Sequence, residues 1–421
     1  MKISVIGLGY VGLPLASLLA ESFDVVGFDV DYNKVKALLE NEIIIHEPGL
    51  DEFFRSSRKS GRLIISSDPD TIRDAQVKII TVGTPYDEAN DFVDYSQLDS
   101  SLDIIIPRIN KGDVIVLKST VPPGTTMLMV RGRVEKNGYH VSEDVGVAFS
   151  PERIIEGQAI SDFKSLPKII GASDDRTFEI VKKVIGSLGG KIIRVSSPDT
   201  AEMIKMVDNY ARFVFLGLTN ELALVCEKNG VDVLEVIKAA KDEYPRNAGI
   251  LYPGPGVGGS CLNKDPFILR GVSKRAGLVL KMVTSAKEVN SFMPVHIAEM
   301  VKSFRSKGNV TLLGVAFKGD TDDIRYTPTF KIRDELAEAG FKVRLSDPFV
   351  EGNNIIKDMY EACKGAGSIV LLTDHSEYKR IDLGRLKMIT TNNPLFIDTR
   401  GILDREKALY HGFEYHGLGR L

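Results

Sequence analysis

Residues 254–266 read GPGVGGSCLNKDP and place one of the chain's three cysteines, Cys261, behind a glycine-rich stretch. Glycines at this density are typical of a loop whose backbone must approach a ligand closely. Asp265 followed by Pro266 is a strong helix start, so we expect Cys261 to lie just before a helix N-terminus, with Lys264 nearby. The helix end and the lysine both favour the thiolate form of a cysteine. We therefore expect Cys261 to be a nucleophile, whereas Asp265 serves either as a helix cap or as part of the site.

The segment GLGYVG near the N-terminus supplies Gly7, Gly9 and Gly12 in the GxGxxG spacing. It lies between a strand-like and a helix-like stretch, and Asp29 ends the next strand, which is the context that a dinucleotide fingerprint requires. In this motif the first glycine permits a tight turn, the second lets the backbone meet a pyrophosphate, and the third allows the helix to pack closely on the strand. Asp29 can accept hydrogen bonds from ribose hydroxyls and repels a 2′-phosphate. We therefore predict NAD rather than NADP as the cofactor.

Lys205 and Asn209 are four residues apart, on one face of a predicted helix. They could form an ordinary surface pair, but their apolar neighbours favour a face turned into a site, where Lys205 could stabilise an oxyanion. NAD combined with an activated cysteine indicates a particular chemistry. Attack of the thiol on an aldehyde gives a thiohemiacetal, loss of hydride gives a thioester, and water then releases an acid.

The elements that must position these residues alternate between strand and helix at both ends of the chain. Short β-branched runs separated by helical stretches recur up to about residue 197 and again from about residue 309. This alternation predicts a doubly wound, Rossmann-like α/β domain with a parallel sheet in each region. The second region contains GVAF at 314–317 without the later glycines, so it should hold something other than a dinucleotide.

Between these regions, residues 200–230 contain no turn signal and end in Lys-Asn-Gly, which predicts one helix ~45 Å long. More helical sequence runs to about residue 304. We therefore expect an NAD-binding Rossmann domain (1–196), a helical central domain (197–304) and a C-terminal α/β domain (305–421). A helix this long, without an obvious second core around it, favours pairing with its counterpart in another subunit, so we expect a homodimer.

Composition narrows the class of protein. The 421 residues are 43% hydrophobic and 26% charged, as in soluble globular proteins, and the net charge of -3 argues against nucleic acid as a partner. No uninterrupted apolar stretch approaches the ~18 residues of a membrane span. We expect a cytoplasmic protein, since the N-terminus lacks the regions of a signal peptide and three cysteines are no disulfide framework. Cys226 and Cys363 read as small buried side chains, and the scattered histidines predict no metal site.

Taken together, these motifs resemble those of the UDP-glucose/GDP-mannose dehydrogenase family. The resemblance spans essentially the whole chain and rests on many motifs in the same order: GLGYVGLPLA, VGTP, KSTVPPGTT, SPERIIEG, TAEMIKMVDN, PRN, GPGVGGSCLNKDP, GVAFKGDTDDIRYTP and IDTRG. It implies an NAD-binding Rossmann domain, a long dimerisation helix and a C-terminal domain that helps bind a UDP-sugar. The family oxidises the C6 hydroxyl of a nucleotide sugar to a carboxylate in two hydride transfers, with two NAD per sugar.

The resemblance also implies which residues form the site. Those expected in catalysis are Cys261, Lys205, Asn209, Asp265, Glu152 and Thr120. The fingerprint and the resemblance together assign to the cofactor Gly7, Gly9, Tyr10, Val11, Gly12, Asp29, Lys34, Thr84, Thr120 and Arg325. Those expected at the substrate are Glu152, Arg153, Lys205, Asn209, Arg246, Gly258 and Lys318.

Several of these residues have specific roles in the family. Asp265 and Thr120 match residues that hold or activate water, and Glu152 matches the glutamate implicated in thioester hydrolysis. Arg246 resembles the arginine that reaches into the site of the partner subunit. Because the pKa of each group depends on burial, the sequence leaves open which of Thr120, Glu152 and Asp265 is the general base.

The identity of the sugar depends on finer motif differences. The motifs PER followed by EG, YPRN and PGVGG resemble the UDP-N-acetylhexosamine branch, especially UDP-N-acetylmannosamine dehydrogenases, whereas UDP-glucose enzymes usually show PEFL and GFGGSC. Arg153, a cation in place of Phe, could hydrogen-bond an acetamido or diphosphate oxygen. Ser260 and Lys264 are a counter-signal, because the acetylhexosamine branch often has other residues there. We expect oxidation of UDP-N-acetyl-D-mannosamine to UDP-N-acetyl-D-mannosaminuronate, with UDP-glucose or UDP-N-acetylglucosamine as the alternative.

Two other classes of protein share part of this pattern. A β-hydroxyacid dehydrogenase also joins a Rossmann domain to a helical domain with a lysine. It would produce one NADH per substrate, however, and would need neither Cys261 nor the C-terminal α/β region. A non-catalytic NAD-binding regulator would have no use for an activated thiol. The combination of Cys261, Lys205 and Asp265 therefore favours the nucleotide-sugar enzyme.

Overall fold

A computed structural model of the chain describes five stretches, residues 1–45, 47–88, 91–155, 157–244 and 249–420. The chain divides into two compact units, Met1–Asp208 and Asn209–Leu421, each built on its own sheet. Throughout the described stretches, no helix is both long enough and apolar enough to cross a bilayer.

The sheet of the first unit has eight strands in the order β10-β9-β8-β7-β4-β1-β2-β3. They are β1 (Lys2–Ile6), β2 (Asp24–Phe28), β3 (Leu63–Ser66), β4 (Val77–Ile80), β7 (Val114–Leu117), β8 (Gly146–Phe149), β9 (Lys168–Ala172) and β10 (Ile192–Val195). A separate short hairpin joins β5 (Tyr86–Asp87) to β6 (Phe92–Val93). The central strands are buried along their whole length, as expected where helices cover both faces of a sheet.

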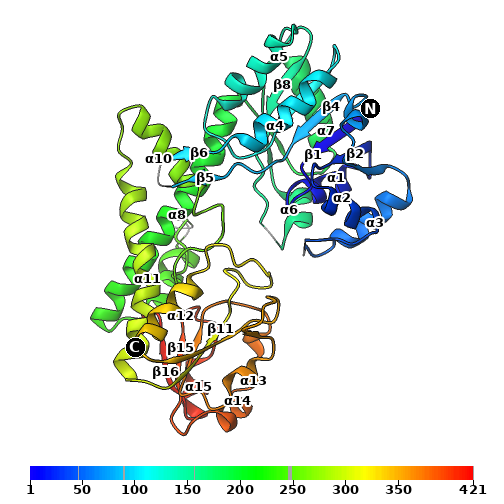
Figure 1. Cartoon of the computed structure of the whole chain (residues 1–421). Helices are drawn as coiled ribbons and strands as arrows, with labels where there is room; N and C mark the ends of the chain where they lie inside the picture. Colours follow the sequence, from blue (N-terminus) through cyan, green and yellow to red (C-terminus); the bar gives the residue numbers. More distant parts are fainter. Residues whose placement is uncertain (46, 89–90, 156, 245–248, 421) are drawn as a thin grey trace. The chain divides into compact units, whose positions relative to one another are not determined.

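Helices lie on both faces of this sheet (Figure 1). They are α1 (Gly12–Leu19), α2 (Tyr32–Leu39), α3 (Leu50–Lys59), α4 (Ser96–Ile105), α5 (Gly132–Lys136), α6 (Ala159–Ser165) and α7 (Asp175–Gly186). Two short 3-10 helices, η1 (Pro69–Ile72) and η2 (Ile106–Arg108), and a π-helix, η3 (Thr126–Arg131), accompany them. Alternate residues of one strand enter two different cores: Val77 and Ile79 of β4 pack in one, and Ile80 in the other. The doubly wound α/β fold predicted from the sequence is confirmed.

The sheet departs from the predicted parallel arrangement in one pairing, near one edge. β9 runs antiparallel to β8, and β10 pairs in parallel with β9, so these two strands oppose the other six. A buried apolar strand carries no mark of its direction, because its side chains alternate between the two faces in the same way in either orientation. The connection through α6 decides the direction, and the sequence does not reveal its path.

The long helix α8 spans Pro198–Asn229, which is 32 residues. This confirms the single helix predicted for residues 200–230. It begins in the first unit and continues into the second (Figure 1).

The second unit has a six-stranded parallel sheet in the order β13-β12-β11-β14-β15-β16. Its strands are β11 (Asn309–Leu313), β12 (Lys342–Ser346), β13 (Ile355–Ile356), β14 (Ser368–Leu371), β15 (Leu395–Asp398) and β16 (Glu414–Gly417). Its helices are α9 (Val233–Ile237), α10 (Asp265–Arg275), α11 (Lys281–Phe304), α12 (Pro328–Glu338), α13 (Met359–Cys363), α14 (Leu383–Ile389) and α15 (Arg405–Tyr410). A π-helix, η4 (Lys238–Asp242), and a 3-10 helix, η6 (Tyr378–Arg380), accompany them.

Helix α11 packs against the C-terminal part of α8 (Figure 1). The side chains of Asn220 and Asn290 are joined by a hydrogen bond of 2.9 Å, and both residues are buried. Gly217 faces Ala286 so closely that a Cβ on the glycine would stand 2.7 Å from the Cβ of the alanine. The two helices therefore form a tightly packed pair, and α11 ends near residue 304 as the sequence predicted.

Candidate active site

The GLGYVG segment forms the turn between β1 and α1. Gly7 has a φ of 94°, in the left-handed region that glycine tolerates. A Cβ on Gly12 would overlap the carbonyl oxygen of Gly7, whereas no described atom lies within 4 Å of where a Cβ on Gly9 would stand. The three positions therefore fit the tight turn, the close helix–strand packing and the approach of a pyrophosphate that NAD binding requires.

Asp29 follows β2 and its carboxylate is held beside the glycine turn. It is 6% exposed, and Oδ2 accepts hydrogen bonds from the backbone N–H of Leu8 (2.7 Å) and from Nζ of Lys34 (2.8 Å). The other oxygen accepts a hydrogen bond from the backbone N–H of Asp31. The carboxylate lies where this fold binds the ribose of a dinucleotide, so the residues present fit NAD. Tyr10 lies in the same turn and is half-buried.

Val11 is also half-buried, and its side chain packs against the hydrophobic core of the first unit. A residue that the sequence did not single out, Thr81, acts beside it. Its Oγ1 donates to the carbonyl oxygen of Gly7 at 2.7 Å. This contact ties the end of β4 to the glycine turn. Thr81 directly precedes the VGTP motif, but its type alone gave no sign of this role.

The loops that follow β4 and β7 are joined to each other at the C-terminal edge of the sheet. Oγ1 of Thr84 donates to the carbonyl oxygen of Thr120 at 2.6 Å, and Oγ of Ser119 donates to that of Val82 at 2.6 Å. The structure thus brings together Thr84 and Thr120, which the sequence assigned to the cofactor side. Ligands of open α/β sheets bind at this edge.

Glu152 lies on the loop after β8, at the same edge. Its Oε1 accepts hydrogen bonds from the backbone N–H groups of Arg153 (2.8 Å) and Ile154 (3.2 Å), and its Oε2 lies 3.2 Å from Nζ of Lys118. Lys118 is 3% exposed. The guanidinium of Arg153 does not extend toward solvent; it pairs with Asp208 at 3.0 Å and donates to a backbone carbonyl.

Two charged side chains near the start of α8 are buried: Glu202, at 0% exposure, and Lys205, at 8%. The carboxylate of Glu202 accepts hydrogen bonds from the backbone N–H groups of Gly124 and Thr126 and from the hydroxyl of Thr126. It therefore holds the PPGTT loop against the helix. Burial raises the pKa of Glu202 to about 7, although these donors favour the charged form.

Glu202→Gln should flatten the dependence of stability on pH. A carboxyl whose pKa is higher in the folded chain binds its proton more tightly there, so it stabilises the fold fully below its ordinary pKa of 4.5 and loses this contribution as the pH rises through about 7. Between about pH 4.5 and pH 7 the free energy of unfolding should therefore fall by on the order of 3 kcal/mol. Glutamine does not titrate, so the variant should lack this fall. Thermal unfolding midpoints across this range would measure it, with the exposed Glu221→Gln on the same helix as control. Equal pH dependence in the wild type and Glu202→Gln would contradict the prediction.

In the second unit, Asp265 is the first residue of α10 and is fully buried. Its Oδ2 accepts a hydrogen bond of 2.6 Å from Nδ2 of Asn209 on α8, and Oδ1 lies 3.9 Å from Nζ of Lys264. The expectation that Asp265 caps the helix is wrong: Lys264 occupies the N-cap position, and no side chain caps this end. The carboxylate of Asp265 instead accepts a hydrogen bond from Asn209, which is far away in sequence.

Cys261 is exposed, whereas Cys226 and Cys363 are buried, as the sequence predicted. The carbonyl oxygen of Cys261 accepts hydrogen bonds from the backbone N–H groups of Lys264 (3.2 Å) and Asp265 (2.9 Å). These bonds form a turn over residues 261–265 that leads directly into α10. The thiol of Cys261 and the buried carboxylate of Asp265 are therefore carried by one short segment, and Asn209 contacts that carboxylate from α8.

The glycines ahead of Cys261 make room for other parts of the chain. A Cβ on Gly258 or on Gly259 would collide with Phe317, and a Cβ on Gly254 would stand 2.7 Å from Nη1 of Arg400. The backbone N–H of Gly259 donates to the carbonyl oxygen of Arg325 at 2.9 Å. The density of glycine is thus explained by close packing on the loop after β11, and a ligand is not needed to account for it.

That loop carries two of the predicted residues. Arg325 forms a bidentate ion pair with Asp323, at 2.6 Å for the shorter contact, and Lys318 is half-buried. The sequence did not single out Arg400, which pairs with Asp374 at 3.2 Å and lies against Gly254. It lies two residues after Asp398, which ends β15, in the quoted motif IDTRG, and this position was the available signal.

The predicted residues thus fall into two groups, one in each unit. Arg246 lies outside the described residues. Among the residues that the structure describes, no group of three or more His, Cys, Asp or Glu side chains could hold a metal ion.

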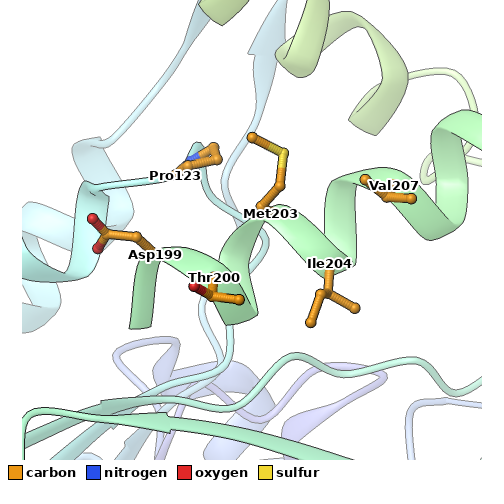
Figure 2. Close-up of a pocket in the computed structure, with 6 residues that line it drawn as sticks. All are labelled: Pro123, Asp199, Thr200, Met203, Ile204 and Val207. Atoms are coloured by element: carbon orange, nitrogen blue, oxygen red, sulfur yellow. The ribbon is translucent and has the colours of Figure 1, made fainter. Parts of the chain in front are cut away.

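A shallow depression also lies on α8 in the first unit (Figure 2). It is open, has a volume of about 400 Å³ and is almost wholly apolar. Figure 2 shows its lining residues, which are Pro123, Asp199, Thr200, Met203, Ile204 and Val207. Because few polar groups line this depression, it lacks the side chains that a catalytic site needs.

Comparisons with known proteins cover the whole chain. Residues 1–188 match the NAD binding domain of the UDP-glucose/GDP-mannose dehydrogenase family, residues 199–292 its central domain and residues 311–405 its UDP binding domain. A UDP-N-acetyl-D-mannosamine dehydrogenase of Methanocaldococcus jannaschii is 34% identical, over 99% of this chain and 96% of the relative. A UDP-glucose 6-dehydrogenase of Rhizobium meliloti is 33% identical over the full length of both chains.

A solved structure of a UDP-D-ManNAc dehydrogenase from Pyrococcus horikoshii superposes with a TM-score of 0.90 at 31% identity, covering 100% of this chain and 99% of that one. The three family domains follow one another in the expected order, and the glycine turn and the thiol-bearing loop occur in the domains that the motifs predicted. The chain belongs to the UDP-glucose/GDP-mannose dehydrogenase family.

Proposed function

We propose that the chain oxidises the C6 hydroxyl of UDP-N-acetyl-D-mannosamine to the carboxylate, with two molecules of NAD per sugar. The observation that carries this proposal is full-length similarity to enzymes of that name, in a chain with a fitting dinucleotide turn and an exposed cysteine. The UDP-glucose relative is similar over its full length as well, so UDP-glucose is the alternative sugar. UDP-N-acetylglucosamine is a second alternative.

In the proposed reaction, residues of the first unit hold the cofactor. Gly7, Gly9 and Gly12 present the backbone to the pyrophosphate, and Asp29 with Lys34 meets the adenosine ribose. NAD, when bound, supplies the hydride acceptor for both oxidation steps. Thr84 and Thr120, joined to each other, line the cofactor side.

Cys261 acts as the nucleophile on the aldehyde that the first oxidation produces. Its sulfur forms a bond to C6, and the thiohemiacetal then loses a hydride to become a thioester. Lys205 stabilises the oxyanion that forms at the C6 oxygen, since a largely buried ammonium interacts strongly with nearby charge. Asn209 and Asp265, joined by their hydrogen bond, hold a water or a substrate hydroxyl in place.

Glu152 activates the water that attacks the thioester carbonyl. The C–S bond breaks, the thiolate of Cys261 is released, and the new carboxylate leaves with the sugar. We assign Lys318 and the backbone of Gly258 to the nucleotide sugar. Because Arg153 pairs with Asp208, we assign it to the support of the Glu152 loop as well as to the substrate.

The sugar and the stoichiometry can be tested in one experiment. NADH production is measured with UDP-N-acetylmannosamine, UDP-glucose, UDP-N-acetylglucosamine and GDP-mannose, each as a limiting substrate. We expect two NADH per molecule of UDP-N-acetylmannosamine and a kcat/KM for it at least about tenfold above the others, a difference of about 1.4 kcal/mol in transition-state binding. One NADH per sugar would remove the thioester route, and preference for UDP-glucose would replace the sugar while keeping the chemistry.

We further propose that the protein is a homodimer through α8. Apolar side chains on this helix are exposed: Met203 (38%), Val207 (50%), Leu218 (40%) and Val225 (53%). The open apolar depression formed by Pro123 and the start of the helix adds to this surface. Exposed apolar side chains along one helix favour burial against another chain. Arg246 is assigned to the partner's site on the resemblance alone.

The same proposal includes the domain boundaries at 1–196, 197–304 and 305–421, which the matched family domains support. A cytoplasmic location remains a prediction from the sequence.

A further inference from the structure

Lys118 is a buried lysine to which the proposed reaction gives no role. It directly follows β7, and Glu152 follows β8, the parallel neighbour of β7, so both residues lie at the C-terminal edge of the sheet. The Lys118 side chain is only 1% exposed. Burying an ammonium group is costly unless it is paired and hydrogen-bonded, so the position of this charge requires an explanation.

The ammonium group of Lys118 has two partners in the same loop. Nζ donates to the carbonyl oxygen of Ser150 at 3.1 Å and lies 3.2 Å from Oε2 of Glu152. The other carboxylate oxygen, Oε1, accepts two backbone hydrogen bonds from its own loop. The carboxylate is therefore held at both oxygens, and its side-chain rotamer is fixed.

The hydrogen bonding of Oε2 is incomplete. This atom is buried and has no hydrogen bond of good geometry among the described residues, since Lys118 meets it as an ion pair. A carboxylate oxygen has two lone pairs, so Oε2 retains the capacity to accept a hydrogen bond from a water molecule. A general base needs this arrangement: an oriented oxygen with a lone pair to spare.

Further cations surround Glu152. Lys168 is buried on β9, and its charge interacts with both Glu152 and Lys118. The ammonium of Lys168 is occupied by the carbonyl oxygens of Leu166 (2.6 Å) and Asp162 (3.4 Å). Arg153 is occupied by Asp208. Lys118 is therefore the cation of this group that contacts the carboxylate of Glu152 directly.

We infer that Lys118 is a positioning residue for the hydrolysis of the thioester: it orients Glu152 so that Oε2 accepts a proton from the attacking water. The inference rests on the proposed function. In this step the water oxygen bonds to the thioester carbon, the electron pair of the C–S bond leaves on sulfur, and one water proton passes to Oε2 and then to solvent. No electrons are exchanged with the cofactor in hydrolysis, so Lys118 should affect neither hydride transfer.

The test is Lys118→Met, which keeps most of the length of the side chain and removes its charge. NADH formation is followed from the first turnover, with the preferred UDP-sugar of the wild type. We expect a burst of about two NADH per site to remain, followed by a steady-state rate on the order of tenfold or more below that of the wild type with little change in KM. Mass spectrometry after acid quenching should find the acyl group on Cys261.

Two companion variants separate positioning from folding. Lys118→Arg keeps the charge and should recover much of the steady-state rate. Lys78→Met removes another buried lysine, paired with Asp113 at 2.8 Å at the opposite edge of the same sheet. In Lys78→Met the ratio of the burst-phase rate to the steady-state rate should equal that of the wild type.

A wild-type ratio of burst to steady-state rate in Lys118→Met, with no trapped thioester, would overturn the inference whatever the total activity. If Lys118→Met does not fold, Lys118→Gln is judged by the same ratio. Failure of the wild type to give two NADH per sugar would instead refute the proposed function, so the two failures are distinguishable.

Discussion

Cys261→Ser should abolish formation of the uronate by an otherwise folded protein, with kcat lowered on the order of 10³-fold or more. The exchange replaces one sulfur by one oxygen on an exposed side chain, so it should leave packing unchanged. The hydroxyl of serine ionises far less readily than a thiol and is a poor nucleophile without an adjacent base. In the proposed mechanism this loss stops the second oxidation, because no thiohemiacetal forms.

The other two cysteines provide matched controls. Cys363 is fully buried, and burial raises the pKa of its thiol to about 12, so it stays protonated and unreactive at neutral pH. Cys226 is buried on α8. Both Cys226→Ser and Cys363→Ser should keep the two-NADH stoichiometry, although a buried hydroxyl will cost stability.

Alkylation gives an independent measurement on the unmodified chain. Iodoacetamide added to the folded protein should label Cys261 first, and the activity should fall in step with that label, as peptide mapping would show. Full production of the uronate by Cys261→Ser, or full activity after labelling of Cys261, would exclude this thiol from the chemistry.

The sequence predicted those features of the fold that depend on local patterns. The long helix α8 was evident because no turn residue interrupts it, and the glycine turn was evident because the spacing of its three glycines between a strand and a helix is a known local pattern. The assignment of Cys226 to the interior followed from its apolar surroundings. Each of these predictions needed only neighbours within a few residues.

What the sequence missed depends on contacts between distant segments. Asp265 binds Asn209 instead of capping its own helix, and the glycines before Cys261 make room for Phe317 and Arg400. Lys118 could not be linked to Glu152 before the sheet order was known, because only the pairing of β7 with β8 brings their ends together. Residue type and local spacing do not reveal such pairs.

Gly12→Ala and Gly9→Ala should both impair the use of NAD, but for different reasons. A Cβ on Gly12 would overlap the carbonyl oxygen of Gly7 and would stand 2.6 Å from Oγ1 of Thr81. Backbone atoms cannot rotate away as a side chain can, so α1 must shift from the turn. Overpacking of this kind costs about 1–3 kcal/mol and occasionally more, so Gly12→Ala should unfold at a lower temperature with or without NAD.

Gly9→Ala should leave the fold intact, since no described atom lies within 4 Å of the added Cβ. The methyl group would instead stand where the backbone is expected to meet the pyrophosphate. We therefore expect an unchanged unfolding midpoint without the cofactor. The NAD affinity should be weaker by on the order of tenfold or more, which corresponds to about 1.4 kcal/mol or more of binding free energy.

Thermal unfolding with and without NAD, together with calorimetric titration of NAD, measures both effects in one pair of proteins. The increase in midpoint on adding NAD should shrink in Gly9→Ala, because ligand stabilisation follows affinity. The opposite assignment, a destabilised Gly9→Ala and a stable Gly12→Ala that binds NAD normally, would mean that the turn does not present its backbone at Gly9. The NAD site would then have to be sought elsewhere at the C-terminal edge of the sheet, where Thr84 and Thr120 are joined.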